Sequence, residues 1–572
     1  MRKTLAALGC LSLTAAAPLL ATGEALDLST DADVSIVGAA AEDISGYYAR
    51  VGGDVNGDGC DDIVLGAWGY DDRRGKVEVI YGGPSLPSQM DLSTDSDVTM
   101  YGIATGDAFG YCLDSGGDVN DDGIADIVVG AWEADTHGFS SGEAYVFYGS
   151  RDLPATLSAA TDADVTIEAA GAADYLSHAL CSTGDVNGDG VADIVIGAYG
   201  VSGRKGKTYV FYGGKSLPAN LSTATDADVT IQGTTADDAS GHSISTEGDI
   251  DGDGTDDIVI GAYGASDYRG RTYVIYGDAA LPALIDLADA DLAITGENEQ
   301  DLSGHCVNAA GDVNGDGYDD IAIGAFLADP GARDAAGAAY LVLGGPALPA
   351  TMFLPASADA LVEGSYDGDH AGLAVTVGSD TDWDGLCDMA VGAPWADPGG
   401  ALSAGRAAVF GGGGLSGTLD FEADADVLGG GPHNAAWAGW WIAGGGDVNG
   451  DGIDDLAVGT YSADPPGLNN AGITYLLFGR PRTSLAAGWN LVSHMRPCDW
   501  PLAGTVLSDG SVLRTWQEAV AAGWVQEPAF YYEAGVSYKR LRLAGGEDDQ
   551  WRAGLGYWVL NLSGGSLTLS TR

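Results

Sequence analysis

Seven copies of a nine-residue acidic loop constrain this chain more than any other feature of its sequence. The first copy, residues 54–62, reads Asp-Val-Asn-Gly-Asp-Gly-Cys-Asp-Asp and is followed by a short apolar run that ends in Gly-Ala. A repeat at this regular spacing indicates one structural unit that occurs seven times. The copies begin at Asp54, Asp118, Asp185, Asp249, Asp312, Asp380 and Asp447.

The loops have the ligand pattern of a hard cation such as Ca²⁺. Oxygen-bearing side chains stand at positions 1, 3, 5 and 9, the backbone carbonyl of position 7 is available, and Gly at position 6 permits the sharp turn. The alternative is a set of Asp/Asn-Gly turns without metal, which would crowd like charges together. An EF-hand is excluded, because its position 12 is a Glu on a helix, whereas here it is Leu, Val or Ile on a strand.

We therefore expect about seven calcium sites, each made by one loop. The predicted ligands are Asp54, Asn56, Asp58, Cys60 and Asp62; Asp118, Asn120, Asp122, Ile124 and Asp126; Asp185, Asn187, Asp189, Val191 and Asp193; Asp249, Asp251, Asp253, Thr255 and Asp257; Asp312, Asn314, Asp316, Tyr318 and Asp320; Asp380, Asp382, Asp384, Leu386 and Asp388; and Asp447, Asn449, Asp451, Ile453 and Asp455.

Each repeat unit contains four strand-like runs. In the second unit they lie at residues 110–113, 127–129, 144–148 and 164–167. Short β-branched and aromatic runs between Gly/Asp turns are strand signals. Four strands per unit, repeated seven times, predict an all-β, seven-bladed β-propeller with four-stranded blades.

The two ends of the repeat array predict how the ring closes. A strand-like run at residues 31–36 precedes the first loop, and no equivalent run follows the last unit's third strand at 475–478. We expect the N-terminal strand to complete blade seven as its outer strand, because closure would remove an aggregation-prone edge.

The repeat resembles the FG-GAP repeats of integrin α-subunit propellers and their bacterial secreted relatives, over residues 26–480. Gly-Ala-Pro is complete only at residues 392–394, Pro is replaced elsewhere, as at 66–68, and Phe-Gly occurs only at 109–110. The metal loops therefore carry the match. The resemblance implies a calcium loop between the first and second strands of a blade, and a scaffold that recognises other macromolecules, often in adhesion.

The charge of the chain limits its partners. Residues 26–480 hold 74 acidic and 14 basic residues, and the whole chain has a formal net charge of −59. Nucleic acid and anionic membranes both require Lys/Arg patches, so neither is expected as the main partner.

Residues 1–25 have the pattern of a secretory signal peptide, with Arg2 and Lys3 before an apolar stretch. No later segment is apolar enough to span a membrane, so we expect a secreted or cell-surface bacterial protein. The remaining cysteines form no CxxC pair, and a disulfide framework is not expected in so long a chain. They are Cys60, Cys112, Cys181, Cys306, Cys387 and Cys498.

Three histidines share one repeat position, seven residues before a loop. They could ring the propeller axis and bind a transition metal. Alternatively, this position requires a flat ring that packs between blades. The position holds Tyr47, Tyr111, His178, His242, His305, Leu373 and Trp440 in chain order.

The composition changes in residues 481–572, which hold 8 basic and 8 acidic residues and six of the 13 Trp. Alternating patterns at 489–493 and 557–562 predict strands, and residues 513–522 a short helix. We expect a small Trp-rich β domain, similar to the "GWNLVS…GYWV" modules that end many secreted bacterial proteins. Its aromatic rings either stack on sugars or form its core.

No nucleophile elbow, HExxH or P-loop occurs in the chain, so we expect no enzyme. The predicted function is a non-catalytic adhesion or macromolecule-binding scaffold with structural calcium, whose partner is an extracellular protein or glycan. The ligand is expected at the face opposite the calcium hairpins or at the channel mouth, where residues 328–337 and 463–470 are insertions. The alternatives are a carbohydrate-binding lectin and a polysaccharide lyase with an unrecognised site.

Overall fold

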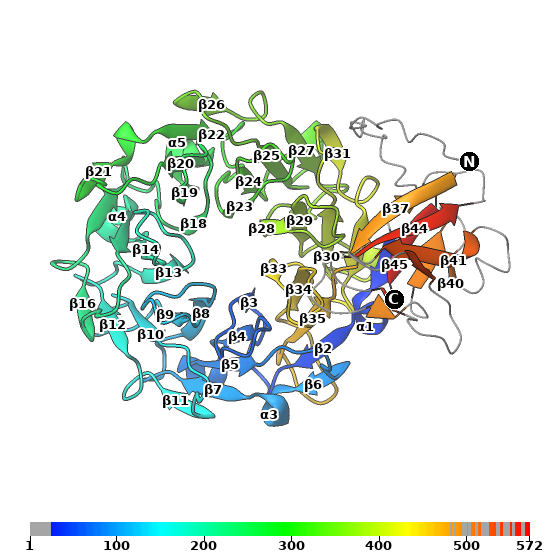
Figure 1. Ribbon diagram of the computed structural model, residues 1–572. Helices are drawn as coiled ribbons and strands as arrows, with labels where there is room; N and C mark the ends of the chain where they lie inside the picture. The colour runs from blue at the N-terminus through cyan, green and yellow to red at the C-terminus, as the bar shows by residue number, and fades with distance from the viewer. Residues whose placement is uncertain are drawn as a thin grey trace.

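The computed structural model describes residues 24–480 without interruption and ten strands between residues 483 and 571. Seven five-stranded sheets surround a common axis, which confirms the seven-bladed β-propeller (Figure 1). Blades 1 to 7 are numbered here by the loops that begin at Asp54 to Asp447. The predicted signal peptide lies outside the described residues, except for Glu24 and Ala25, which lie in the first strand, β1.

Each blade holds four antiparallel strands from the axis outward, as predicted, and a short fifth strand. The innermost strands of blades 1 to 7 are β3 (Ala49–Val51), β8 (Phe109–Asp114), β13 (Leu176–Cys181), β18 (Ser243–Gly248), β23 (Val307–Gly311), β28 (Val375–Ser379) and β33 (Trp441–Gly446). The second strands are β4 (Ile63–Ala67), β9 (Ile127–Ala131), β14 (Ile194–Ala198), β19 (Asp257–Ala262), β24 (Asp320–Ala325), β29 (Asp388–Ala393) and β34 (Asp455–Thr460).

The outer strands follow in the same blade order. The third strands are β5 (Lys76–Ile80), β10 (Glu143–Phe147), β15 (Lys207–Phe211), β20 (Arg271–Ile275), β25 (Ala338–Val342), β30 (Arg406–Phe410) and β35 (Ile473–Leu477). The fourth are β7 (Val98–Tyr101), β12 (Val165–Glu168), β17 (Val229–Gln232), β22 (Leu292–Thr295), β27 (Ala360–Glu363), β32 (Val427–Gly430) and β2 (Val34–Val37). The fifth are β11 (Thr156–Ser158), β16 (Asn220–Ser222), β21 (Leu284–Asp286), β26 (Thr351–Phe353), β31 (Gly417–Asp420), β1 (Glu24–Asp27) and β6 (Gln89–Asp91).

The fifth strands were not expected from the sequence, and they link each blade to the next. The fifth strand of blade 1, β11, belongs to the chain segment that leads from the third to the fourth strand of blade 2, and it pairs in parallel with β7. Only three residues long, it has too little periodicity to be recognised in a sequence. Its pairing covers the outer edge of the blade, which would otherwise offer unpaired backbone groups.

The N-terminal segment closes the ring as predicted. β2 pairs antiparallel with β35 and becomes the fourth strand of blade 7. β1 pairs in parallel with β32, so the same segment also completes blade 6. Two blades therefore depend on residues 24–37.

The Gly-Ala signal after each loop reflects the close approach of neighbouring blades. The second strands are buried on both faces, and their Gly lies against the backbone of the next blade. A Cβ at Gly261 would lie 2.1 Å from the carbonyl oxygen of Gly304, and one at Gly66 would lie 2.0 Å from that of Gly110. Only Gly fits where two backbones approach this closely.

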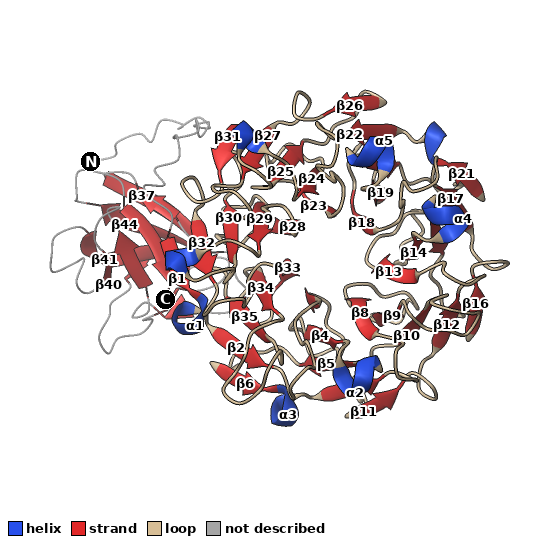
Figure 2. Cartoon of the chain, turned by 180° about the vertical axis from the view of Figure 1, so that it is seen from behind, coloured by secondary structure: helices blue, strands red, loops and turns tan. Residues whose placement is uncertain are grey.

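Short helical turns lie in the connections between strands rather than in the sheets (Figure 2). In the turn that follows β1, the side chain of Asp27 accepts a hydrogen bond from the backbone N–H of Ser29, as an N-cap does. The turns are α1 (Leu28–Asp31), α2 (Tyr70–Arg73), α3 (Leu92–Asp95), α4 (Val201–Arg204), α5 (Ala265–Tyr268), η1 (Leu287–Asp289), η2 (Pro330–Ala332) and η3 (Pro398–Gly400).

The C-terminal segment is rich in strands, as predicted. It forms two four-stranded sheets, β36-β45-β39-β40 and β37-β44-β41-β42, and the pair β38-β43. The predicted helix at 513–522 is wrong for residues 513–515, which form β40; residues 516–522 lie outside the described residues. The strands are β36 (Thr483–Leu485), β37 (Gly488–His494), β38 (Trp500–Pro501), β39 (Thr505–Ser508), β40 (Leu513–Thr515), β41 (Val525–Tyr532), β42 (Tyr538–Arg540), β43 (Gln550–Trp551), β44 (Leu555–Asn561) and β45 (Leu567–Thr571).

Candidate calcium loops and central cup

All seven acidic loops connect the first and second strands of their blades, so they lie at one end of the propeller. Within each loop the carboxylates are held by backbone N–H groups. In the first loop, Asp54 accepts hydrogen bonds from the N–H groups of Asp58 (3.0 Å) and Gly59 (2.7 Å). Asp58 accepts one from Cys60 (3.0 Å), the residue at position 7. The turn thus fixes where the side-chain oxygens lie.

The position-9 carboxylate ties the loop to the rest of the blade. In blade 1, Asp62 accepts hydrogen bonds from the N–H of Val55 in its own loop (2.9 Å) and from that of Gly82 just after the third strand (2.9 Å). Burial raises the pKa of every position-9 carboxyl group: to about 6 for Asp320, to about 7 for Asp62, Asp126, Asp193 and Asp388, and to about 8 for Asp257 and Asp455.

Neighbouring aspartates also raise the pKa of these buried groups. For Asp257, burial has the largest effect, backbone N–H groups oppose it, and the charges of Asp251 and Asp249 raise the pKa further. A buried carboxylate beside other carboxylates is stabilised in its ionised form by a cation. The residues present therefore fit a bound Ca²⁺.

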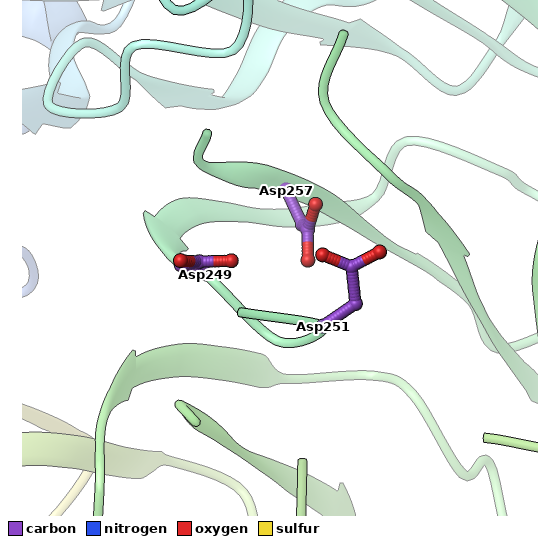
Figure 3. A group of neighbouring side chains, drawn as sticks. All are labelled: Asp249, Asp251 and Asp257. Carbon is purple, nitrogen blue, oxygen red and sulfur yellow. The ribbon is translucent and has the colours of Figure 1, made fainter. Parts of the chain in front are cut away.

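Two loops bring three carboxylates to one point. One oxygen from each of Asp249, Asp251 and Asp257 lies within 4.8 Å of the others, and Figure 3 shows their side chains around a common space. The sixth loop does the same with Asp380, Asp382 and Asp384. These are the two loops in which position 3 is Asp rather than Asn.

Four of the loops with Asn at position 3 have the amide turned toward position 9. In blade 1 the Nδ2 of Asn56 lies 3.2 Å from Oδ1 of Asp62, and blades 2, 3 and 7 repeat this contact. A calcium ion would require the amide to present Oδ1 instead, which is a rotation about its last torsion. In blade 5, Asn314 contacts Asp316.

Another aspartate in every blade supports the loop, and the sequence analysis did not assign it this role. It lies immediately before the fourth strand. Its Oδ2 accepts a hydrogen bond from the N–H of a residue just after the third strand, next to the residue that binds position 9. The recurring Asp-Ala-Asp-Val pattern was a usable signal for it. These residues are Asp33, Asp97, Asp164, Asp228, Asp291, Asp359 and Asp426.

The opposite end of the propeller carries a central cup of about 290 Å³. The innermost strands run from this end toward the calcium loops, so the seven residues at or just before the starts of these strands line the cup. They are Tyr47, Tyr111, His178, His242, His305, Leu373 and Trp440, the shared repeat position.

A second tier of aromatic rings supports the first. The residue after Gly-Ala or Gly-Thr is aromatic in six blades, and in blade 6 the aromatic ring is one residue later. Trp68 contacts both Tyr47 and Tyr111, and Tyr263 contacts both His242 and His305. The aromatic residue that follows Gly-Ala or Gly-Thr is visible in the sequence and could have predicted this tier. Its members are Trp68, Trp132, Tyr199, Tyr263, Phe326, Trp395 and Tyr461.

The three histidine rings pack against one another in tilted pairs. The ring centres of His178 and His242 lie 4.4 Å apart, and those of His242 and His305 lie 4.7 Å apart. Burial lowers the pKa of His178 and His305 to about 4, so these rings are neutral at neutral pH. Among the described residues, the ligand atoms of three Asp side chains converge in the fourth and sixth loops, whereas the three histidines do not form such a group.

Below the aromatic tiers, an ion pair crosses the cup. The Arg50 guanidinium of blade 1 donates through Nε to Oδ1 of Asp114 (2.6 Å) and through a terminal nitrogen to Glu247 of blade 4. Glu247 also accepts a hydrogen bond from the hydroxyl of Thr183 (2.7 Å). Because blade 4 lies across the ring from blade 1, Arg50 and Glu247 form a polar floor to the cup.

The predicted insertions and several exposed apolar side chains lie at the cup end. Residues 328–337 and 463–470 connect second and third strands, as do the loops with Phe139 (71% exposed) and Leu402 (63% exposed). Tyr366 (61% exposed) lies between a fourth strand and the next blade. The five cysteines in the described residues are free, and Cys498 lies outside them.

Comparison with known proteins agrees with this architecture. A family model for the FG-GAP repeat matches residues 179–211, 240–275, 308–342 and 438–477. Integrin alpha-PS2 of Drosophila melanogaster is 32% identical over 232 residues, which cover 39% of this chain and 15% of that protein. Human phosphatidylinositol-glycan-specific phospholipase D is 34% identical over 185 residues, which cover 30% of this chain and 21% of that protein.

The matched region thus spans less than a quarter of either relative, and the relatives include both integrins and a phospholipase. The repeat alone does not decide between a binding protein and an enzyme. No helix within the described residues has the length and apolar character needed to cross a membrane. The chain carries FG-GAP repeats on a seven-bladed β-propeller and is similar in this part to integrin α subunits.

Proposed function

We propose that this protein is a secreted, calcium-loaded β-propeller that binds an extracellular macromolecule at its cup end without catalysis. The observation that carries the proposal is the separation of two sets of groups on one rigid ring. Carboxylate loops lie at one end, and an aromatic cup with exposed apolar side chains lies at the other. Exposed apolar groups around a concave aromatic site are typical of a recognition surface.

Calcium has a structural role in this proposal. Positions 1, 3, 5 and 9 would hold it with side-chain oxygens, and position 7 with its carbonyl oxygen. The ion would neutralise the crowded carboxylates of each loop. Because position 9 also binds the N–H that follows the third strand, an ordered loop fixes three strands of its blade. Because the cup lies at the other ends of these strands, calcium would also stabilise the shape of the cup.

A carbohydrate is the second candidate for the ligand, and the cup favours it. The cavity of about 290 Å³ has aromatic walls and a polar floor of Arg50 and Glu247. Aromatic rings pack against the apolar faces of sugars, while charged and amide groups bind hydroxyl groups. One of the similar proteins is a phospholipase D, so catalytic activity is the result that would contradict a purely binding role.

An array of glycans and extracellular proteins, probed with the calcium-loaded protein, tests the proposal. Specific binding is expected, with loss in Trp440→Ala at the cup and in Phe139→Ala in a connection at the same end of the propeller. Phe353→Ala is the matched control, because this side chain is also largely exposed (59%, against 71% for Phe139) but lies on the outer strand β26. Binding that survives both cup-end variants would refute the placement, and chemical change of a bound ligand would refute the non-catalytic role.

A further inference from the structure

Position 8 of the acidic loops has no place in the predicted ligand set, yet it varies in a pattern that the structure explains. It is Asp in four loops and Ala or Cys in three. In chain order the residues are Asp61, Ala125, Ala192, Asp256, Asp319, Cys387 and Asp454.

Each position-8 aspartate binds the first residue of the calcium loop in the preceding blade. The carboxylate of Asp256 accepts a hydrogen bond from the N–H of Asp185 (2.8 Å), while the N–H of Asp256 donates to the carbonyl of Asp185 (3.2 Å). The backbone of a predicted calcium ligand is therefore held on both sides. We call the hydrogen bond from the position-1 N–H to the position-8 carboxylate the clasp.

The clasp recurs at three other blade junctions. Asp319 forms both bonds with Asp249 (2.9 and 3.1 Å), and Asp61 forms both with Asp447 (2.9 and 3.2 Å). In the fourth case, the carboxylate of Asp454 accepts a hydrogen bond from the N–H of Asp380 (3.0 Å).

The other three junctions lack the carboxylate. At two of them the backbone bond is kept: the N–H of Ala125 donates to Asp54 (3.3 Å) and that of Cys387 to Asp312 (3.0 Å). A separate backbone bond to position 2 of the preceding loop occurs at all seven junctions, as from Asp278 to Val186 (3.2 Å). The junctions thus differ mainly in whether position 8 supplies an acceptor.

We propose that Asp61, Asp256, Asp319 and Asp454 are positioning residues for the calcium sites of the blades that precede them. The loops 185–193, 249–257, 380–388 and 447–455 then bind calcium more tightly than the loops 54–62, 118–126 and 312–320. The inference rests on the proposed calcium binding and adds a ranking of the seven sites by calcium affinity. It also makes each clasped site depend on correct packing of the next blade.

The physical reason is preorganisation. The position-1 carboxylate can meet a cation only when its backbone has the conformation of the loop, and a held backbone loses less freedom on binding. Without the acceptor, the position-1 N–H loses its partner at a half-buried site. Removal of the clasp should therefore weaken calcium binding in the preceding blade more than in the blade that carries the substitution.

The sixth loop carries its own reporter for this effect. Trp383 stands at position 4 of that loop, where the other loops have Gly or Asp, so it can sensitise luminescence of Tb³⁺ bound in place of Ca²⁺. Tyr side chains lie in or beside other loops, as Tyr318 does, so Trp is excited selectively; Trp383→Phe should then abolish the signal and so establishes its origin. The clasp on this loop comes from Asp454 in blade 7.

Titration with Tb³⁺ of the full chain and of three variants tests the proposal. Asp454→Ala should weaken binding at the sixth loop by about tenfold, which is about 1.4 kcal/mol. Asp454→Asn keeps a side-chain acceptor and should stay close to the unaltered protein. Asp256→Ala removes the same group at a distant junction and should leave the Trp383 signal unchanged.

Three results would overturn the proposal. An unchanged midpoint in Asp454→Ala would show that the clasp does not position the ligand. Equal weakening by Asp454→Asn and Asp454→Ala would assign the effect to charge alone. Absence of bound metal in the unaltered protein would overturn the calcium assignment itself, which distinguishes that failure from the other two.

A gain-of-function variant tests the same idea without loss of a native contact. Cys387→Asp places a carboxylate at a junction whose backbone bond to Asp312 is already formed. In a calorimetric calcium titration, the number of sites in the tight class should rise from four to five. A tight class that stays at four would contradict the proposal.

Discussion

Removal of calcium should lower the unfolding temperature of the propeller by about 10 °C. Calcium sites of extracellular modules have Kd values of about 10⁻⁴–10⁻³ M, and free calcium at about tenfold over Kd stabilises each site by about 1.4 kcal/mol. Seven loops together contribute about 10 kcal/mol. The roughly 460 residues of the propeller have an unfolding entropy of about 1 kcal/mol/K, so this free energy corresponds to about 10 °C.

Scanning calorimetry in calcium and in a chelator measures this difference, with metal content determined on both samples. An equal unfolding temperature in metal-free and calcium-loaded protein would refute a structural role for calcium. The structure supplies a finer test at a single loop. Asp251→Ala removes one of the three converging carboxylates of blade 4 and should cost about 1.5 °C in calcium, one seventh of the total.

In the chelator, Asp251→Ala should not be destabilising. Burial, and then the charge of Asp253, raises the pKa of Asp251, so its removal relieves repulsion in the metal-free loop. Asp251→Asn is the matched control, because five other loops carry Asn at this position. Destabilisation by Asp251→Ala in both conditions would mean that the side chain acts through packing rather than through calcium.

Three further predictions concern the ring itself. In a denaturant titration, Gly261→Ala should lower the free energy of unfolding by at least about 1–3 kcal/mol, because its Cβ would lie 2.1 Å from the carbonyl oxygen of Gly304. Gly171→Ala is the control and should leave the free energy of unfolding unchanged, because the nearest atom to its Cβ would lie 3.6 Å away. In saturating calcium, which keeps the position-9 carboxylates ionised, acidification from pH 6.5 to 4 should remove the stabilisation that neutral His178 and His305 provide. Burial lowers their folded-state pKa to about 4, so the unfolded chain binds more protons in this window. This stabilisation is fully present above pH 6.5 and is lost toward pH 4. The double variant His178→Phe/His305→Phe should flatten the pH dependence of the unfolding temperature, and an unchanged slope would exclude these groups as its cause. A chain that begins at Gly38 lacks β1 and β2 and should self-associate in size-exclusion chromatography through the exposed edge of β35, until a peptide of residues 24–37 is added; a stable monomer without the peptide would show that closure is not needed.

Much of the fold could be predicted from short-range patterns. The loop at 54–62 contains its own turn and its own predicted ligands, and the next strand follows at once. Its role can therefore be predicted from about ten residues. The unpaired run at 31–36 predicted closure because a strand without a partner at one end matched a missing strand at the other. The helix predicted at 513–522 was wrong at its start, where the strand β40 shows that pairing overrides local propensity.

The sequence by itself determined the number of blades, the position of the acidic loops and the strand that closes the ring, because these follow from turns and strand pairs that recur in every unit. Only the tertiary structure decided what the units build together. Arg50 and Glu247 lie 197 residues apart and meet only because the ring brings blades 1 and 4 to face each other. The clasp between Asp256 and Asp185 likewise joins residues 71 positions apart. The aromatic cup and the links between loops depend on how neighbouring blades pack, and no pattern within one repeat contains that geometry.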